Sequence, residues 1–445
     1  MVTPVAPQSA NLAEWLNWLE TLSPREIVLG LDRVQAVLSR LGLQRPKRVV
    51  TVAGTNGKGS TAAMLAALYG AAGCKVAIYT SPHVSRFNER MCVADQMLSD
   101  SAIVNAFLKV ESVRQDVPLT YFEFGTLAAL VAFAEARAEV YVLEVGLGGR
   151  LDAVNAIDPD GAVICNVSLD HCDWLGADVE SIAREKAGVM RAGIPVVYGA
   201  SPAPQAIVDI AQSTGANLLL ADRDFHLGGN EPGRPGWTFA FRDLAPITLQ
   251  VPALAGKFQV RNAAGALALY QSLEGTDTLT PPAIDAAFSA VRLAGRMQRL
   301  DTTHRWLLDV GHNPAAAKAL AEELARSHAG NITAILGVLA DKDLTGLVQP
   351  LLPHVDSWIA VTPRAPRALP AMELASRVAS LAEKPCWIAE SIEAALTLAV
   401  DLSAQTDLIV VTGSFYTVGP ALDTLAPVAR STLGYTRDAD TKGAS

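Results

Sequence analysis

The chain has 445 residues, of which 50% are hydrophobic, and a formal net charge of −9. At roughly 100–200 residues per domain, this length predicts two or three domains with apolar cores. Proteins that bind a nucleic-acid backbone usually carry an excess of basic residues, and this chain has a net negative charge. We therefore expect small-molecule substrates and no nucleic acid.

Neither the cysteines nor the amino terminus indicates export. The five cysteines follow no repeating spacing, which argues against a disulfide framework and favours a reducing compartment. The first residues, MVTPVAPQSANLAEW, lack the basic and apolar regions of a signal peptide. No apolar run reaches the roughly 18 residues of a membrane helix. We therefore expect a cytoplasmic protein without a membrane partner.

In chain order, two helical patterns come first, NLAEWLNWLETL at 11–22 and GLDRVQAVLSRLGL at 30–43. From residue 48, strand-like apolar runs alternate with helical stretches. These runs are RVVTVAG, KVAIYTS, VYVLEVG, AVICNVS and IPVVYG. Such alternation predicts a mostly parallel, P-loop-type sheet with helices on both faces.

Residues 51–61 read TVAGTNGKGST, a Gly-rich connection from a strand to a helix. Backbone N–H groups in such a turn converge on phosphate oxygens. Lys58 would add a charge to the outer phosphates, and Ser60 or Thr61 a hydroxyl to Mg²⁺. The stretch departs from G-x-x-x-x-G-K-[ST], because its first glycine is Gly54 and Gly59 follows the lysine. The alternative is an ordinary turn that contains a lysine.

Two later strands end in polar side chains at the same sheet edge. Glu144 ends VYVLE, where an acid suits Mg²⁺, although a salt bridge is the alternative. Asp170, His171 and Asp173 follow AVICNVSL. A lone histidine is more often structural, and Cys172 beside it lacks the further ligands that zinc needs. A metal-proximal cluster of Glu144 and His171 is therefore a hypothesis.

The next segment combines a charged helix with a run of strands. The composition of SIAREKAGVMR indicates a charged helix face, so we expect Lys186 in it to be exposed to solvent. Between about 215 and 255, NLLLADRDF, GWTFAFRD and ITLQVPAL follow one another without helices. We expect a small antiparallel appendage here.

A second alternating series begins near residue 305 and predicts a smaller, Rossmann-like α/β domain. The domains are predicted as 1–292 and 293–430, with a flexible tail at 431–445. Asp309, His312 and Asn313 follow a strand, and Asn313-Pro314 is a helix start. Asp309 would alternatively satisfy loop amides. Arg296, on the linker, is placed for delivery to a phosphate.

These stretches resemble one family. GTNGKGS, TSPHVSRFNER, LTYFEFGTLAAL, LEVGLGGRLDAVN, LDHCDWLG, IAREKAGVMR, RNAAGALAL, LAGRMQ, DVGHNP, GVLADKD and VTGSFYTVG are similar, in order and spacing, to dihydrofolate synthase/folylpolyglutamate synthase of the Mur ligase superfamily. The resemblance runs from about residue 12 to 425. The shortened G-T-x-G-K loop is the form of that superfamily, which accounts for the departure from the strict pattern.

The resemblance implies an ATP-dependent amide ligase that works through an acyl phosphate. It would add L-glutamate to dihydropteroate, giving dihydrofolate, and to reduced folates, giving γ-linked polyglutamates. The implied cofactors are ATP, one or two Mg²⁺ ions and a carbamylated lysine at Lys186. A monomer is expected.

The resemblance also implies roles for individual residues. The nucleotide would contact Thr55, Asn56, Gly57, Lys58, Gly59, Ser60, Asn262, Arg296 and Asp309. The metal ligands would be Ser60, Glu144, His171 and the Lys186 carbamate. The pterin side of the substrate would contact Thr120, Tyr121, Phe122, Glu123, Asp152 and Ala153. The catalytic residues would be Lys58, His171, Lys186, Arg296 and His312.

Three positions depart from the family pattern, and three alternative functions stay open. Val28 stands where an aspartate is expected, so the pterin pocket would differ at that edge. Gly311 and Ala294 replace a usual alanine and a usual proline. The alternatives are a monofunctional folylpolyglutamate synthase, another Mur-type amino-acid ligase, and a nucleotide sensor without ligase activity. LTYFEFGT argues against the first, and the sensor predicts loss of Lys58, Glu144, His171 or Lys186, which are all present.

Overall fold

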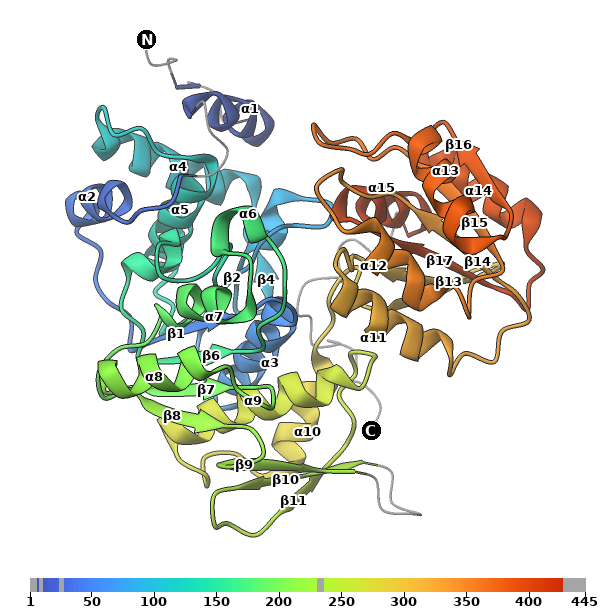
Figure 1. The fold of residues 1–445 in the computed structure, drawn as a ribbon. Helices are drawn as coiled ribbons and strands as arrows, with labels where there is room; N and C mark the ends of the chain where they lie inside the picture. Colours follow the sequence, from blue (N-terminus) through green and yellow to red (C-terminus); the bar gives the residue numbers. More distant parts are fainter. Residues whose placement is uncertain (1–5, 8–10, 24–27, 230–235, 427–445) are drawn as a thin grey trace, which may run out of the picture.

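The computed structural model describes residues 6–7, 11–23, 28–229 and 236–426, which form two α/β halves side by side (Figure 1). The expected tail at 431–445 lies outside the described residues. None of the described helices is long and apolar enough to cross a membrane.

An eight-stranded sheet organises the N-terminal half, in the order β4-β3-β2-β5-β1-β6-β7-β8. The strands are β1 (Arg48–Ala53), β2 (Val76–Tyr79), β3 (Met91–Val93), β4 (Gln96–Met97), β5 (Val140–Glu144), β6 (Gly161–Ile164), β7 (Pro195–Tyr198) and β8 (Asn217–Leu220). From β2 to β8 neighbours run parallel, while β3 and β4 form an antiparallel edge. The fold class expected from the sequence is confirmed.

Helices cover both faces of this sheet, because alternate strand residues point to opposite sides. Val49 and Ala53 of β1 join one apolar cluster, and Val50 and Val52 join the other. The first face carries α1 (Leu12–Leu22), α2 (Asp32–Leu41), α4 (Asp100–Arg114), α5 (Tyr121–Glu135), α7 (Val179–Ala187) and α8 (Gln205–Thr214). The second carries α3 (Lys58–Ala71), α9 (Phe258–Glu274) and α10 (Pro281–Ala290). Short helical turns are η1 (Phe87–Arg90), η2 (Ala153–Ala156) and α6 (Cys172–Leu175).

A small antiparallel sheet, ordered β11-β10-β9, packs on the second face. Its strands are β9 (Phe225–Gly228), β10 (Trp237–Phe241) and β11 (Ile247–Leu249). The run NLLLADRDF does not belong to it as a whole. Its first residues form β8 of the main sheet, paired parallel to β7, and only Phe225 begins the small sheet.

The C-terminal half holds a six-stranded sheet, ordered β12-β13-β17-β14-β15-β16. Its elements are β12 (Gln298–Asp301), β13 (Arg305–Asp309), α11 (Pro314–Leu324), β14 (Ile332–Leu336), α12 (Leu344–Val348), η3 (Gln349–Leu351), β15 (Ser357–Val361), α13 (Ala371–Ala382), β16 (Cys386–Ala389), α14 (Ile392–Leu402), β17 (Leu408–Thr412) and α15 (Phe415–Leu425). All neighbours are parallel except β12, an antiparallel edge strand that the sequence pattern did not reveal.

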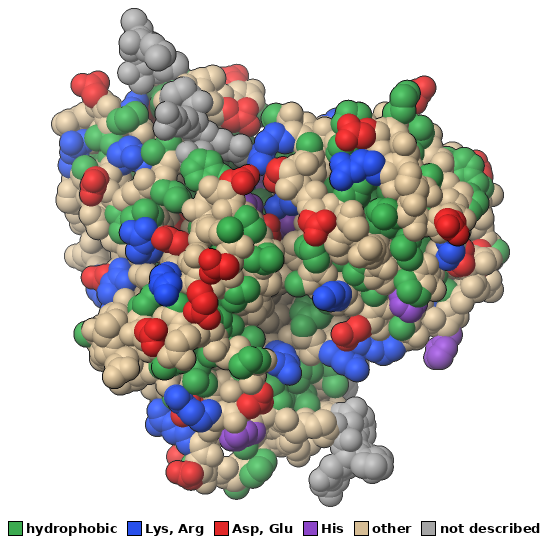
Figure 2. All heavy atoms as spheres, viewed as in Figure 1, with side chains coloured by type: hydrophobic (Ala, Val, Ile, Leu, Met, Phe, Trp, Pro, Cys, Tyr) green, Lys and Arg blue, Asp and Glu red, His purple; other side chains and the backbone are tan. Residues whose placement is uncertain are grey.

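The carboxyl ends of the parallel strands meet between the two halves. The β1 loop contacts the segment after β13, since the side-chain amides of Asn56 and Asn313 bond to each other. Val84, in the segment between β2 and η1, packs on the C-terminal core. On the face shown in Figure 2, the surface is hollowed between the two halves, with histidine side chains inside. In open α/β sheets, ligands bind outside the carboxyl ends of the strands.

Candidate active site

The loop from β1 to α3 has a backbone that only glycine fits at two positions. Gly54 has φ +146°, and a Cβ there would lie 3.0 Å from the Cys165 Cβ. Gly57 has φ +84°, and its Cβ would lie 2.6 Å from the Asn262 Oδ1. Such φ values are strained for residues with a side chain. The loop therefore lies tightly against β6 and α9, with its backbone free to approach a phosphate.

The loop is further held by the backbone and the side chain of Asn166, which follows β6. Thr55 N donates to Asn166 O at 3.0 Å, and Asn56 N donates to Asn166 Oδ1 at 3.1 Å. Lys58 Nζ donates to Thr55 O at 3.2 Å, so its ammonium folds back over the loop. A phosphate bound there would meet an ammonium already in place.

Ser60 lies in the first turn of α3 and is almost fully buried. Its Oγ accepts from Gln259 Nε2 at 3.2 Å, and Gln259 Oε1 accepts from Asn262 Nδ2 at 2.9 Å. Asn262 thereby reaches the loop through Gln259, a residue that the sequence reasoning missed. RNAAGALAL pointed to Asn262, but nothing singled out the position three residues before it.

Glu144 ends β5, beside the loop. It is 3% exposed, and its Oε2 accepts from Ser81 N at 3.1 Å. Burial raises the pKa of this carboxyl above its ordinary value, against opposing effects of Lys58 and the Ser81 hydrogen bond. A buried carboxylate facing a cation and a phosphate loop is an oxygen donor suited to Mg²⁺.

Lys186 is buried, unlike the solvated lysine that composition suggested. It is 4% exposed, and its Nζ donates to Gly54 O at 2.9 Å. Burial, together with the Lys58 charge, lowers the pKa of Lys186 to about 7. The helix α7 brings it there because Ile182 and Ala183 of the same helix are buried. A lysine with this pKa is substantially neutral at neutral pH.

His171 follows β6 and keeps 41% of its side chain exposed. Burial of the ring lowers its pKa, against the opposing charge of Asp170. A neutral imidazole can accept a metal ion. In the part of the chain that the structure describes, no group of three or more His, Cys, Asp and Glu side chains is arranged to hold a metal ion. Any metal ligand set must therefore include other donors.

Arg296 reaches the site from the segment between α10 and β12. Its guanidinium carbon lies 5.0 Å from the centroid of the Phe415 ring. Among the described residues, no acceptor forms a hydrogen bond or ion pair with this guanidinium. Burial lowers its pKa, while Asp309 and Glu144 act in the opposite direction, and an arginine stays charged in proteins. Arg296 is thus a cation without an anionic partner at the domain junction.

Asp309 holds the backbone around Arg296. Its Oδ2 accepts from Met297 N at 3.0 Å, and its Oδ1 accepts from Gly311 N at 2.9 Å. Met297 has φ +47°, a conformation that costs energy unless neighbours hold it. Asp309 therefore accepts hydrogen bonds from loop amides, whether or not it also contacts a nucleotide. A Cβ on Gly311 would lie 2.6 Å from Asp309 Oδ1, so the usual alanine would disturb this contact.

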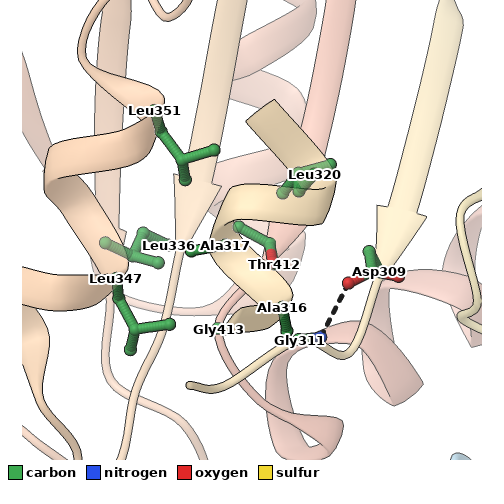
Figure 3. A pocket seen from close by; sticks show the side chains of 10 residues that line it. All are labelled: Asp309, Gly311, Ala316, Ala317, Leu320, Leu336, Leu347, Leu351, Thr412 and Gly413. Carbon is green, nitrogen blue, oxygen red and sulfur yellow. Dashed lines mark hydrogen bonds between the residues drawn. The ribbon is translucent and has the colours of Figure 1, made fainter. Parts of the chain in front are cut away.

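A small pocket lies behind Asp309 in the C-terminal half (Figure 3). Its volume is about 10 Å³. The lining residues, Asp309, Gly311, Ala316, Ala317, Leu320, Leu336, Leu347, Leu351, Thr412 and Gly413, are mostly apolar. A water molecule needs about 10–15 Å³ and polar partners. This pocket is a packing gap, and no ligand site.

His312 lies beside these groups and is neutral. Burial and the charge of Lys342 lower its pKa to about 4. Its Nδ1 lies 3.0 Å from Val310 O, so Nδ1 carries the proton and donates to that carbonyl. The lone pair of Nε2 is then available to an incoming donor.

The expected pterin-side residues are partly engaged in the fold. Thr120 and Glu123 form a capping box at the start of α5, and Glu123 Oε1 accepts from Arg33 Nη2 at 2.7 Å. The same Arg33 atom donates to Val28 O at 2.7 Å. Arg33 thus links Val28, which departs from the family pattern, to the LTYFEFGT segment. The sequence reasoning did not single out this arginine.

The remaining residues of this set converge on the loop after β5. Phe122 lies so close that a Cβ on Gly146 would come within 2.6 Å of its ring. Asp152 accepts from Leu147 N at 2.9 Å and Val154 N at 3.0 Å, and burial raises its pKa to about 6. Ala153 is buried. Tyr121 lies farther along, with the Arg90 guanidinium carbon 5.6 Å from its ring centroid. The structure therefore brings the two segments together beside Glu144.

Replacing Gly57 with alanine is expected to weaken nucleotide binding without unfolding the chain. The new Cβ would displace Asn262, and the φ of +84° would be strained. We expect the Kd for ATP to rise at least about tenfold. A residue with a side chain held at such a φ costs of order 1–3 kcal/mol. Isothermal titration calorimetry measures this effect. Gly73→Ala is the matched control, because Gly73 has φ +83° with open space around its Cβ. An equal effect of both changes would contradict the close approach at the loop.

Known proteins resemble this chain along most of its length. A model of the Mur ligase middle domain matches residues 52–270, and a model of the Mur ligase glutamate ligase domain matches residues 295–415. The dihydrofolate synthase/folylpolyglutamate synthase of Escherichia coli strain K12 is 39% identical over 428 residues, which cover 96% of this chain and 98% of that protein.

Two solved structures extend this comparison to the fold. E. coli FolC in complex with DHPP and ADP superposes with a TM-score of 0.88 at 38% identity, covering 95% of this chain and 99% of that one. A bifunctional folylpolyglutamate synthase/dihydrofolate synthase with Mn, AMPPNP and L-glutamate bound has a TM-score of 0.86 at 40% identity, covering 95% of this chain and 100% of that one. The likeness therefore extends over both domains.

Proposed function

Because this chain belongs to the dihydrofolate synthase/folylpolyglutamate synthase family of Mur ligases, we propose how its site performs an ATP-dependent ligation. The chain is an ATP-dependent ligase, as the resemblance implied. It adds L-glutamate to dihydropteroate, giving dihydrofolate, and to reduced folates, giving γ-linked polyglutamates. The observation that carries this proposal is the contact of the phosphate loop with the other domain, through the side chains of Asn56 and Asn313.

The first step must join two anions. A carboxylate oxygen of the folate substrate attacks the γ-phosphorus of ATP, the bond to ADP breaks, and an acyl phosphate forms. Lys58 and the unpaired guanidinium of Arg296 offset the repulsion and stabilise the charge that develops on the transferring group. The loop residues Thr55 to Ser60, with Asn262 and Asp309, bind the nucleotide.

In the second step, the free amine of L-glutamate attacks the acyl carbon and inorganic phosphate leaves. The amine gives up a proton to the departing phosphate as the amide forms. The Nε2 lone pair of His312 accepts a hydrogen bond from this amine and orients it. Water must be kept out, since it would hydrolyse the acyl phosphate.

The residues present fit Mg²⁺. The Glu144 carboxylate, the Ser60 hydroxyl and the neutral His171 imidazole lie around the loop. Glu144 Oε2 accepts from Ser81 N, and Ser60 Oγ accepts from Gln259 Nε2. Mg²⁺ bound there would neutralise phosphate charge. We further propose that Lys186 carries a carbamate, which would replace a buried amine with oxygen ligands for a second ion.

The pterin side of the substrate is proposed to lie along Thr120 to Glu123 and Asp152 to Ala153. The aromatic rings of Tyr121 and Phe122 would pack on the pterin. A monofunctional folylpolyglutamate synthase is the second candidate, favoured by Val28 at the edge of this region. We also propose a cytoplasmic monomer of two domains, 1–292 and 293–430.

One assay tests the two activities separately. Purified protein with ATP, Mg²⁺ and L-glutamate is offered dihydropteroate or tetrahydrofolate, and the amide product is quantified by mass spectrometry. We expect product from both substrates. Product from tetrahydrofolate alone would establish the monofunctional enzyme. Product from neither, with ATP still bound, would refute the ligase.

A further inference from the structure

A carboxylate of the N-terminal domain, Asp170, is bonded to the C-terminal domain. Its Oδ1 accepts from Lys342 Nζ at 3.1 Å, and its Oδ2 accepts from Asn313 Nδ2 at 3.1 Å. The side chains of Asp170 and Lys342 are each only 10% exposed. An exposed ion pair contributes little, but a buried charge that loses its partner is strongly destabilising. This contact is therefore sensitive to the relative position of the domains.

Asn313 connects this carboxylate to the phosphate loop. Its Oδ1 accepts from Ala316 N at 3.0 Å, which caps α11, and from Asn56 Nδ2 at 3.2 Å. Its Nδ2 donates to Asn56 Oδ1 at 2.9 Å as well as to Asp170. Both ends of the amide are thus used, and Asn313 is 3% exposed. The C-terminal domain therefore contacts the loop after β1 and the loop after β6 through one side chain.

We propose that Asp170, Asn313 and Lys342 form an interdomain latch, which holds the C-terminal domain over the phosphate loop. In the reaction proposed above, on which this inference rests, Asp170 and Lys342 are positioning residues. The latch holds Asn56 in place, since Asn313 Nδ2 donates to both Asn56 Oδ1 and Asp170 Oδ2. Without it, the acyl phosphate would meet water before it meets the amine.

The latch predicts a specific defect, which is loss of coupling between ADP release and amide formation. Lys342→Met and Asp170→Asn are each expected to lower the amide formed per ADP at least about tenfold, because each change leaves the other member of a buried pair without its partner. The double variant should be no worse than either single variant, because both changes break one interaction. Effects that multiply in the double variant would refute the latch.

The variant Asn313→Asp distinguishes the role of Asn313 in the latch from its role as the cap of α11. Aspartate keeps the acceptor that caps α11, but it removes the donor and places a second carboxylate opposite Asp170. We expect the coupling defect with a melting temperature close to that of the unchanged chain. Full coupling in this variant would contradict the role of Asn313.

Glu323→Gln is the matched control for burial and charge. The Glu323 side chain is 11% exposed and pairs with Arg299 at 2.7 Å within the C-terminal domain. This change should leave the amide-to-ADP ratio unaltered. If this change lowered the amide-to-ADP ratio as much as Lys342→Met, loss of any buried ion pair in the C-terminal domain would suffice. That result would refute the latch.

Domain position is measured without turnover by small-angle X-ray scattering, with and without AMPPNP. We expect the unchanged chain to be compact with AMPPNP and Lys342→Met to have a larger radius of gyration. Superimposable curves for the two proteins would overturn the latch. An inactive chain that still closes with AMPPNP would refute the proposed reaction but not the latch, so the two failures are distinguishable.

Discussion

Replacing Lys58 with alanine is expected to lower the rate of ADP release about 10³-fold, since removing one preorganised group that stabilises transition-state charge costs about 10²–10³ in kcat. The Lys58 ammonium donates to Thr55 O, and its charge opposes the burial that raises the pKa of the Glu144 carboxyl. When the lysine is removed, protonation of Glu144 relieves the cost of that buried charge. The chain should stay folded. A coupled assay for ADP, with L-glutamate and tetrahydrofolate present, measures the effect, and circular dichroism checks the fold.

Two further variants define the role of this lysine. Lys47→Ala removes an exposed lysine just before the other end of β1, and it should leave the rate unchanged. Lys58→Arg keeps the charge but not the compact ammonium, and it should recover only part of the rate. Turnover of Lys58→Ala equal to that of the unchanged chain would remove the loop lysine from the proposed mechanism.

Replacing Lys186 with methionine is expected to lower ligase activity by at least about 100-fold, because even the outer-shell partners of a bound metal contribute up to about this much. Methionine preserves the length and the burial of the side chain but cannot form a carbamate. The ligation assay with tetrahydrofolate measures the loss. Lys75→Met, at an exposed lysine before β2, should be silent. Full activity of Lys186→Met would refute the carbamate.

The same lysine predicts a dependence on pH and bicarbonate. Carbamate formation needs the neutral amine, and the pKa of Lys186 is lowered to about 7 by burial and the Lys58 charge. The neutral fraction therefore rises with pH through about 7. After dialysis against CO₂-free buffer, we expect bicarbonate to restore activity, and to do so faster at higher pH when the concentration of dissolved CO₂ is held constant. A new carbamate signal in the ¹³C NMR spectrum with labelled bicarbonate should accompany recovery, and its absence would contradict the modification.

The sequence predicted much of this site because several of its residues stand at strand ends. TVAGTNGKGST lies between a strand and a helix, and Glu144 and His171 follow strands of the same sheet. Parallel strands present their carboxyl ends at one edge, so the pattern of buried runs was enough to bring them together. Asn313 was likewise readable, as a cap followed by Pro314.

Other features were not readable because they depend on packing between distant segments. Gln259 reaches Ser60 only because α9 packs beside α3. The contact of Asp170 with Lys342 joins residues that are far apart in the chain and belong to different domains. The residues NLLL were predicted to belong to the antiparallel appendage, but in the structure they form β8, which pairs parallel to β7.

Local periodicity and short motifs were enough to predict most strands and helices, the phosphate loop and the family. They did not predict β12 or the parallel pairing of β8. The tertiary structure alone decided which charges are buried. Lys186 reads as a solvated lysine in its helix, but the packing of α7 buries it against Gly54 and lowers its pKa to about 7. Arg296 likewise lacks an anionic partner only in the folded chain, because Asp309 is occupied by backbone amides. Burial is a property of the whole fold, and it makes these side chains reactive.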